Sequence, residues 1–174
     1  MYQAKINGPN ICQFFKEDMN VRAIKRQSVE GDLNRALERN EFVLHYQPKV
    51  NLETGLISGA EALIRWQHPH RGLVYPAEFI PVAEECGLIL AIDRWVLKEA
   101  CNQAQEWNAS GLCPVPMAVS VSSLEFRSNG FLDSLRDVLK RSGLDPRYLD
   151  LELTETALML HANPPSLCSG NSTR

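Results

Sequence analysis

The sequence contains no apolar run that approaches the ~20 residues needed to span a bilayer. Its first ten residues, MYQAKINGPN, are polar and lack the apolar stretch of a signal peptide. Neither sign of charge dominates, because the formal net charge is only −3 over 174 residues. Bulk attraction to a nucleic acid polymer or to an anionic membrane is therefore not expected. Together these absences predict a cytoplasmic protein with no membrane segment.

Cysteine is too scattered to define a site. The five cysteines are Cys12, Cys86, Cys101, Cys113 and Cys168, and no two of them form a CxxC pair. An odd number at wide spacing argues against both a zinc site and a disulfide framework. Reduced thiols in a cytoplasm are the simplest interpretation of this pattern.

The residues that are present fit one ordinary globular domain, with 44% apolar and 22% charged residues. Apolar residues at helical spacing begin at Val29 and predict a first helix there. Strand-like stretches follow at 41–52 and 56–66, and the turn sequence NLETG lies between them at 51–55. This arrangement predicts an antiparallel hairpin.

Beyond the hairpin, helical and strand-like stretches alternate along the chain. Helices are predicted at 76–86, closed by Gly87, at 88–110 and at 124–142, and strands at 116–122 and 148–155. This succession predicts an α/β fold with a parallel sheet. We expect the two longer helices to cover the outside of the sheet with the apolar residues Ile92, Val96, Trp107, Leu135 and Leu139.

Three of the predicted strands carry polar side chains where strands of a buried parallel sheet are usually apolar. Because strand side chains alternate, Glu61 and Arg65 share one face, and Ser120 and Glu152 interrupt their own apolar runs. We expect these four side chains to point to the inner side of a curved sheet. Converging oxygen atoms suit a hard divalent cation, whereas an ion pair between Glu61 and Arg65 would be purely structural. The residues alone leave both interpretations open.

Three blocks of the sequence resemble the EAL domain, a family of bacterial phosphodiesterases that act on cyclic di-GMP. The blocks are HYQPKVNLETGLISGAEALIRWQHP, YPAEFIPVAEECGLI and LDLELTET, in this order, and Glu61-Ala62-Leu63 is the tripeptide that names the family. The resemblance covers roughly residues 29–160. It implies a modified (β/α)8 barrel whose first strand is antiparallel to its neighbour, and hydrolysis of cyclic di-GMP to linear pGpG with Mg²⁺ or Mn²⁺.

The resemblance also implies roles for individual residues. The metal ligands would be Glu61, Ser120 and Glu152, and Ser120 stands where the family has a metal-binding Asn. The dinucleotide site would be lined by Gln47, Leu63, Arg65, Glu78, Phe79 and Pro81. Within that set, Arg65 would lie near phosphate, and the last three residues fall in a segment near the guanine bases. For Leu63 and Phe79, simple core packing is an equally open interpretation.

The family pattern continues beyond the strand that ends at Glu155, with paired aspartates in a DDFG-type motif and a catalytic lysine. The stretch NPPSLCSGNSTR at 163–174 matches none of it. We therefore expect about strands 1–4 of an incomplete barrel, with no catalytic residue assigned and negligible turnover. Its last strand would be an unpaired edge that invites self-association. The alternatives are a catalytically dead module that binds cyclic di-GMP or a protein partner, and a non-functional truncated product.

The ends of the chain define the remaining domain boundaries. Residues 1–15 resemble the last helix and strand of a GGDEF domain, and 16–28 suit a linker. The truncated EAL domain would then occupy 29–162. The segment 163–174 is polar and has no periodicity, so we expect a disordered tail there.

Overall fold

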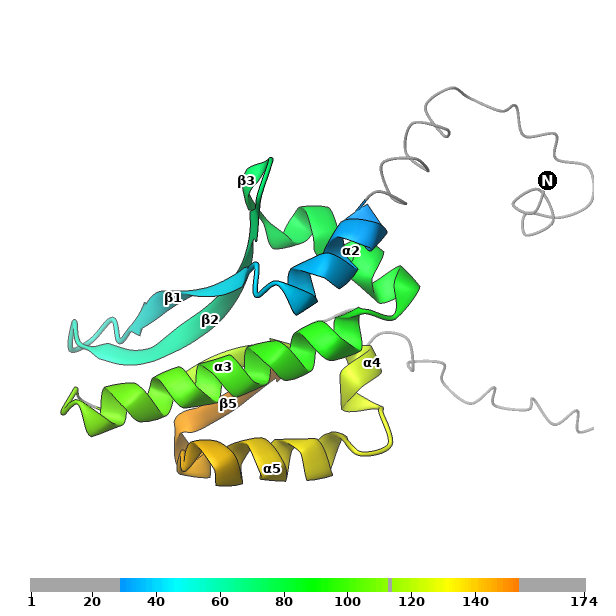
Figure 1. Ribbon diagram of the computed structural model, residues 1–174. Coiled ribbons are helices and arrows are strands. Elements are labelled where there is room, and N and C mark those ends of the chain that lie inside the picture. The colour runs from blue at the N-terminus through cyan, green and yellow to red at the C-terminus, as the bar shows by residue number, and fades with distance from the viewer. Residues whose placement is uncertain (1–28, 113, 154–174) are drawn as a thin grey trace, which may run out of the picture.

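The computed structural model describes residues 29–112 and 114–153, which form one mixed sheet and its helices (Figure 1). The strands are β1 (Phe42–Val50), β2 (Ile57–His68), β3 (Gly72–Val74), β4 (Met117–Val121) and β5 (Leu149–Leu153). The order is β1-β2-β4-β5, with β3 also paired to β2. β1 and β3 run antiparallel to β2, whereas β4 and β5 run parallel to it. The expected α/β class, with an antiparallel first strand and an open fragment of a barrel sheet, is confirmed.

The helices form the second layer of the fold. They are the helix at 29–38, α2 (Pro76–Cys86), α3 (Ile89–Ala109), α4 (Ser123–Phe126) and α5 (Phe131–Ser142), with a 3₁₀ turn at Pro146–Tyr148. In Figure 1, α3 crosses in front of β4 and β5, and α5 lies alongside it. None of the helices in these two ranges is both long and apolar enough to cross a membrane.

The predicted helix at 124–142 is wrong in one respect, because the structure divides it into α4 and α5. The chain leaves helical geometry after Phe126 and resumes it at Phe131. Gly130, which precedes α5, has a φ of 127°, a conformation that other residues rarely adopt. The expected helix stops at Gly87 and Gly143 are confirmed, since both have left-handed backbone geometry and donate an N–H back to their helix.

The apolar contacts expected of the two long helices are present. Ile92 and Val96 are buried on α3, and Trp107, Leu135 and Leu139 are partly buried against the core. Trp107 also packs edge-on against Tyr46 of β1, with ring centroids 4.8 Å apart. The helices therefore cover one face of the sheet, as the alternation predicted.

An aromatic cluster joins α2 to the β1–β2 hairpin. The rings of Phe42, Trp66 and Phe79 lie 5.7–6.1 Å apart, and each side chain is at most 3% exposed. The indole N–H of Trp66 donates to Glu41 at 3.0 Å, so its one polar atom has a partner. This cluster fixes which face of β1 and β2 the helices cover.

The sequence analysis missed strand β3, which pairs with β2 from Trp66 to His68. The turn before it is organised by His68, whose buried ring accepts the backbone N–H groups of His70 at 3.1 Å and Arg71 at 3.3 Å through Nδ1. Its proton therefore resides on Nε2, which lies 3.5 Å from Asp32. Both ring nitrogens of His68 thus serve the fold.

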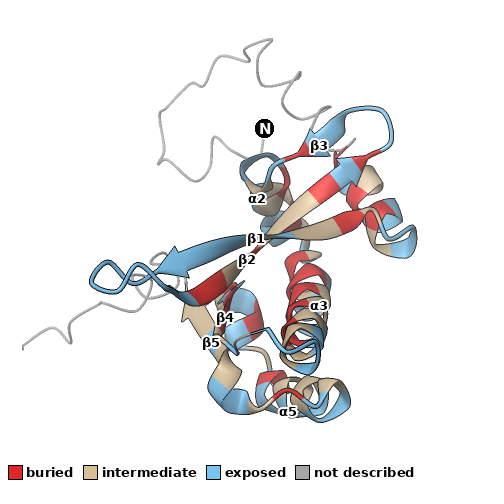
Figure 2. Ribbon diagram, turned by 90° about the vertical axis from the view of Figure 1, so that its left-hand side faces the viewer, coloured by how far each residue is buried: buried red, intermediate tan, exposed pale blue. Residues whose placement is uncertain are grey.

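The tip of the β1–β2 hairpin projects beyond the helices and is exposed (Figure 2). Asn51 closes its turn, because the Asn51 side chain accepts the N–H groups of Glu53 and Thr54. The expected strand near 11–15, the linker at 16–28 and the tail at 163–174 lie outside the described residues, as do Thr154 and Glu155.

We predict that Phe79→Ala lowers the free energy of unfolding by about 3–5 kcal/mol, because it opens a cavity between α2 and the hairpin. Leu73→Ala is the matched control, since Leu73 is 40% exposed on the adjoining strand β3, and it should cost less than about 1 kcal/mol. Urea titrations followed by circular dichroism measure both values. Equal losses for the two variants would contradict this account of the core.

Candidate functional site

The register of the sheet brings the candidate polar residues onto one face. Residues paired directly across strands point to the same side of a sheet. One such row runs through Gln47, Glu61, Ala118 and Asp150, and the next pairs Ser120 with Glu152. Because Ala118 and Ser120 are two residues apart on β4, both rows share one face. The expectation that Glu61, Ser120 and Glu152 lie on the same side is confirmed.

No helix of the described chain covers this face. On the opposite face, Ala62, Trp66 and Val119 are at most 4% exposed, whereas Ser120 and Asp150 on the polar face are exposed. Since the helices pack only against the apolar face, the polar face is open to a ligand or to further protein.

One ion pair crosses the open face. Lys49 of β1 donates from Nζ to Glu152 Oε1 at 2.5 Å, although β1 and β5 are the two end strands of the main order. The hydrogen bond to Glu152 raises the pKa of Lys49, and the charges of Glu61 and Asp150 add to that shift. Both partners are more than 40% exposed, so the pair contributes at most about 1 kcal/mol to stability.

Arg65 shares this face but does not pair with Glu61. Its guanidinium carbon lies 5.1 Å from the centre of the Tyr75 ring, and its Nη1 donates to the Ile64 carbonyl at 2.7 Å. Four residues along a strand separate Cα atoms by about 13 Å, which is too far for a direct contact between Glu61 and Arg65. The structural ion pair left open by the sequence is therefore not formed.

The six predicted substrate residues divide into three groups. Gln47, Leu63 and Arg65 lie on the open face, and Leu63 and Arg65 are half-buried there. Glu78 and Pro81 are exposed on α2, where Glu78 forms an ion pair with Arg71. Phe79 is 0% exposed inside the aromatic cluster, so the structure favours the core-packing interpretation of its side chain.

The candidate metal ligands have suitable chemistry but do not converge. Glu61 and Glu152 lie on strands separated by β4, so their backbones are about 10 Å apart across the sheet. Among residues 29–112 and 114–153, no three His, Cys, Asp or Glu side chains are grouped closely enough to hold a metal ion. Glu152 already binds the Lys49 ammonium. The residues described here therefore do not hold a metal on their own.

The sequence analysis missed a buried polar network at the end of β4. Ser122 is the N-cap of α4 and accepts the backbone N–H of Glu125, three residues further on, at 3.2 Å. The Glu125 carboxylate is 2% exposed and accepts from Arg94 Nε of α3 at 2.9 Å. The pattern Ser-x-x-Glu directly after a strand is a capping-box signature and was the available signal.

Asp93 of α3 completes this network. Its carboxylate accepts the backbone N–H of Ser122 at 3.0 Å and also hydrogen-bonds the Ser122 side chain. Burial raises the pKa of Asp93 to about 6, and the negative charges of Glu125 and Glu84 act in the same direction. The network therefore fixes the residue that follows Val121 and holds the end of β4 against α3.

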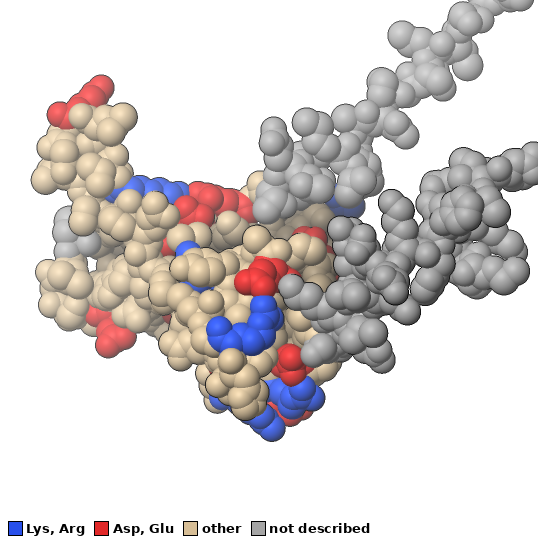
Figure 3. All heavy atoms as spheres, turned by 90° about the horizontal axis from the view of Figure 1, so that it is seen from above, with Lys and Arg blue, Asp and Glu red and all other residues tan. Residues whose placement is uncertain are grey.

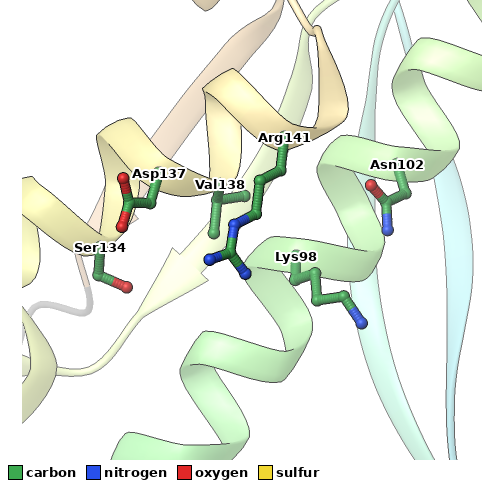
Figure 4. Close-up of a pocket in the computed structure, with 6 residues that line it drawn as sticks. All are labelled: Lys98, Asn102, Ser134, Asp137, Val138 and Arg141. Atoms are coloured by element: carbon green, nitrogen blue, oxygen red, sulfur yellow. The ribbon is translucent and has the colours of Figure 1, made fainter.

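A separate hollow lies in the helix layer. It is lined by Lys98 and Asn102 of α3 and by Ser134, Asp137, Val138 and Arg141 of α5 (Figure 4). None of the predicted site residues lines it. On the face seen from above, acidic and basic side chains of the described residues are interspersed (Figure 3), in keeping with the small net charge.

Comparisons with known proteins agree with this geometry. The family model described as EAL domain matches residues 30–169. The bifunctional diguanylate cyclase/cyclic di-GMP phosphodiesterase MucR of Pseudomonas aeruginosa is 45% identical over 163 residues, which are 94% of this chain and 24% of that protein. The chain therefore spans about a quarter of the length of this curated relative.

Two solved structures are similar in fold and sequence. A structure described as the PaMucR phosphodiesterase in a c-di-GMP complex has a TM-score of 0.74 and 47% identity, covering 78% of this chain and 55% of that one. The FimX EAL domain from Pseudomonas aeruginosa bound to c-di-GMP has a TM-score of 0.67 and 32% identity, covering 76% and 52%. The present chain thus spans about half of each solved chain.

We predict that Asp93→Asn stabilises the protein at neutral pH. The pKa of Asp93 in the fold, about 6, lies above its ordinary value of 3.8, so the folded state binds this proton more tightly than the unfolded state. In the parent, the stability that this bound proton gives to the folded state is fully present below about pH 4 and is lost as the pH rises through about 6. At about pH 7.5 the variant should therefore be about 1–3 kcal/mol more stable than the parent.

Urea titrations at about pH 4.5, 6 and 7.5 test this dependence, with Asp133→Asn as the control because its carboxyl is 84% exposed. The advantage of Asp93→Asn should grow with pH, whereas the control should show no such trend. If Asp93→Asn were more stable than the parent by the same amount at every pH, or at no pH, the claim that burial raises the pKa of Asp93 would be contradicted.

Proposed function

Because the chain belongs to the EAL domain family, we propose that it forms part of a cyclic di-GMP site in a cyclic di-GMP phosphodiesterase. The observation that carries this proposal is the position of Glu61, from the family tripeptide, in one row with Gln47 on the open face. Ser120 and Glu152 occupy the next row of the same face. The relatives named above support the ligand, since both solved structures hold c-di-GMP.

The chemistry of the open face suits a cyclic dinucleotide. The planar guanidinium of Arg65 can donate two parallel hydrogen bonds to a phosphate, which a lysine cannot match. Tyr75 stacks against this guanidinium and restricts its orientation. Leu63 offers an apolar surface beside it, and the exposed Glu78 offers an acceptor for the N–H groups of a guanine base. Each of these roles belongs to the proposal.

The family is metal-dependent, and we propose Mg²⁺ or Mn²⁺ as its ion because carboxylate and hydroxyl oxygens are hard donors. The described donors do not gather into a site for that ion, and a serine hydroxyl at 120 reaches less far than the amide of the family asparagine. Binding of cyclic di-GMP is therefore better supported by these residues than its hydrolysis. A binding module without turnover is the second candidate function, favoured by the Lys49–Glu152 ion pair.

We further propose that residues 1–15 are the end of a GGDEF domain in a longer protein. The alignment with MucR spans 163 of the 174 residues, so it must include residues upstream of the helix at 29–38. That relative is described as a diguanylate cyclase as well as a phosphodiesterase. This supports an upstream cyclase-like segment followed by a linker at 16–28.

We predict that Arg65→Met weakens binding of cyclic di-GMP by about tenfold or more, because a charge-assisted contact to phosphate is lost. Isothermal titration calorimetry of the 174-residue chain measures the affinity. Arg136→Met is the control, since Arg136 is 74% exposed on α5 and pairs only with Asp133 among the described residues. Parent protein that fails to bind cyclic di-GMP, or equal affinities for the two variants, would refute the proposed site.

The same samples separate binding from hydrolysis. With Mg²⁺ or Mn²⁺ present, we expect chromatography to show no pGpG above the background of buffer alone. Turnover that Glu61→Ala abolishes would refute the binding-only candidate and show that self-association assembles a complete site. Sedimentation velocity on the active sample would then reveal an assembly larger than a monomer.

A further inference from the structure

Two carboxyl groups are buried together where α3, α4 and the end of β4 meet. Asp93 of α3 is 9% exposed and Glu125 of α4 is 2% exposed. The charge of Glu125 acts on Asp93, so the two groups lie near each other. The guanidinium of Arg94 pairs with Glu125 at 2.9 Å. When both carboxyls are ionised, this one positive charge therefore faces two buried negative charges.

The hydrogen bonds of the cluster do not satisfy both carboxylates. Asp93 accepts the backbone N–H of Ser122 at 3.0 Å, and Glu125 accepts from Arg94 through Oε1. The second oxygen of Glu125, Oε2, is buried and has no hydrogen-bond partner among the described residues. Because a buried charged oxygen without a donor is costly, the arrangement favours a state in which only one of the two groups is ionised.

The groups that face Asp93 from the neighbouring elements do not offset its charge. Glu84 of α2 and Glu125 of α4 are both acidic and act on it in the same direction. Ser122, at the end of β4, supplies hydrogen bonds but no charge, and the cation of α3 itself, Arg94, is directed to Glu125. Burial, followed by these two acidic groups, raises the pKa of Asp93 to about 6.

The two carboxyls differ in how easily water can reach them. Asp93 lies on α3, a helix of 21 residues, and follows Ile92, which is 1% exposed in the core. Glu125 lies on α4, which has only four residues and whose side chains Leu124 and Phe126 are 49% and 50% exposed. Displacing α4 gives up little apolar burial compared with displacing α3. Glu125 is therefore the group that can move into water when both are charged.

We propose that α4 is a pH-dependent latch on α3, docked while one of the two carboxyls is neutral and released when both are charged. The docked state holds the proton of Asp93 more tightly than the released state. Docking is therefore fully favoured below about pH 4, and this advantage is lost as the pH rises through about 6. Between these values the ratio of docked to released molecules should fall by up to about tenfold per pH unit. The inference does not rest on the proposed function, because no ligand enters it.

Nuclear magnetic resonance of the isotope-labelled 174-residue chain tests the latch. The amide signals of Ser123–Phe126 should move toward unfolded-chain positions as the pH rises from about 4.5 to 7.5, while those of β1 stay in place. Asp93→Asn and Glu125→Gln each remove one of the two charges, so either variant should keep these signals at their low-pH positions throughout. Glu84→Gln is the matched control, since Glu84 is exposed on α2, and its signals should still respond to pH.

Three results would overturn the proposal. They are signals of α4 that do not respond to pH in the parent, a response that persists in Asp93→Asn, and release of α4 at every pH in Glu125→Gln. The last result is the one expected if Glu125 served only to anchor α4 through Arg94. If Asp93→Asn lost the circular dichroism of the fold, Glu125→Gln would decide, because its amide oxygen can still accept from Arg94. The samples contain no cyclic di-GMP, so the nucleotide site is judged separately by the Arg65 experiment.

Discussion

The burial of Trp66 against Phe42 and Phe79 is the constraint on which the rest of this structure depends. Strand side chains alternate, so a buried tryptophan at position 66 places Arg65, and with it Glu61, on the opposite face of β2. A slip of one residue would expose the indole and bury the two charged groups. The register of β2 therefore determines both the apolar cluster and the polar face. Pairing with β2 then determines which side chains of the other strands lie on each face.

The sequence was sufficient for the features that depend on neighbouring residues. Alternation and a turn sequence predicted the β1–β2 hairpin, and the same alternation placed Ser120 and Glu152 on the face of Glu61. β3 was missed because three residues are too few to show a period. The prediction of one continuous helix at 124–142 was wrong because helical spacing alone does not reveal the turn at 127–130 that separates α4 from α5.

The polar contacts of the site were harder to predict because their partners are distant in the sequence. Asp93 reaches Ser122 across 29 positions, and Lys49 reaches Glu152 across 103. The local sequence pattern carries no information about such pairs, since each of these polar residues, taken alone, could equally be a side chain exposed to solvent. Phe79 shows the converse, because the sequence left ligand contact and core packing equally open, and only the fold shows that its side chain is packed in the core.

The two polar assemblies flank the same strands in different environments. Lys49 and Glu152 lie on the open face and remain in contact with water, so their pairing is weak and exchangeable. Asp93 and Glu125 lie behind β4 in the apolar layer, where each carboxylate needs its donors. The end of β4, which carries Ser120 of the proposed site, is therefore held in place by groups in the apolar layer.

The bond from Ser122 to Asp93 has a consequence for how local opening of this protein can be observed. The amide hydrogen of Ser122 is held by a side chain of α3 and not by a neighbouring strand. Its exchange with deuterium therefore requires α3 to separate from the end of β4, whereas exchange of the amides within β4 requires the strands to part. The exchange rate of this one amide therefore reports the separation of α3 from the end of β4, whereas the exchange rates of the amides within β4 report the opening of the sheet.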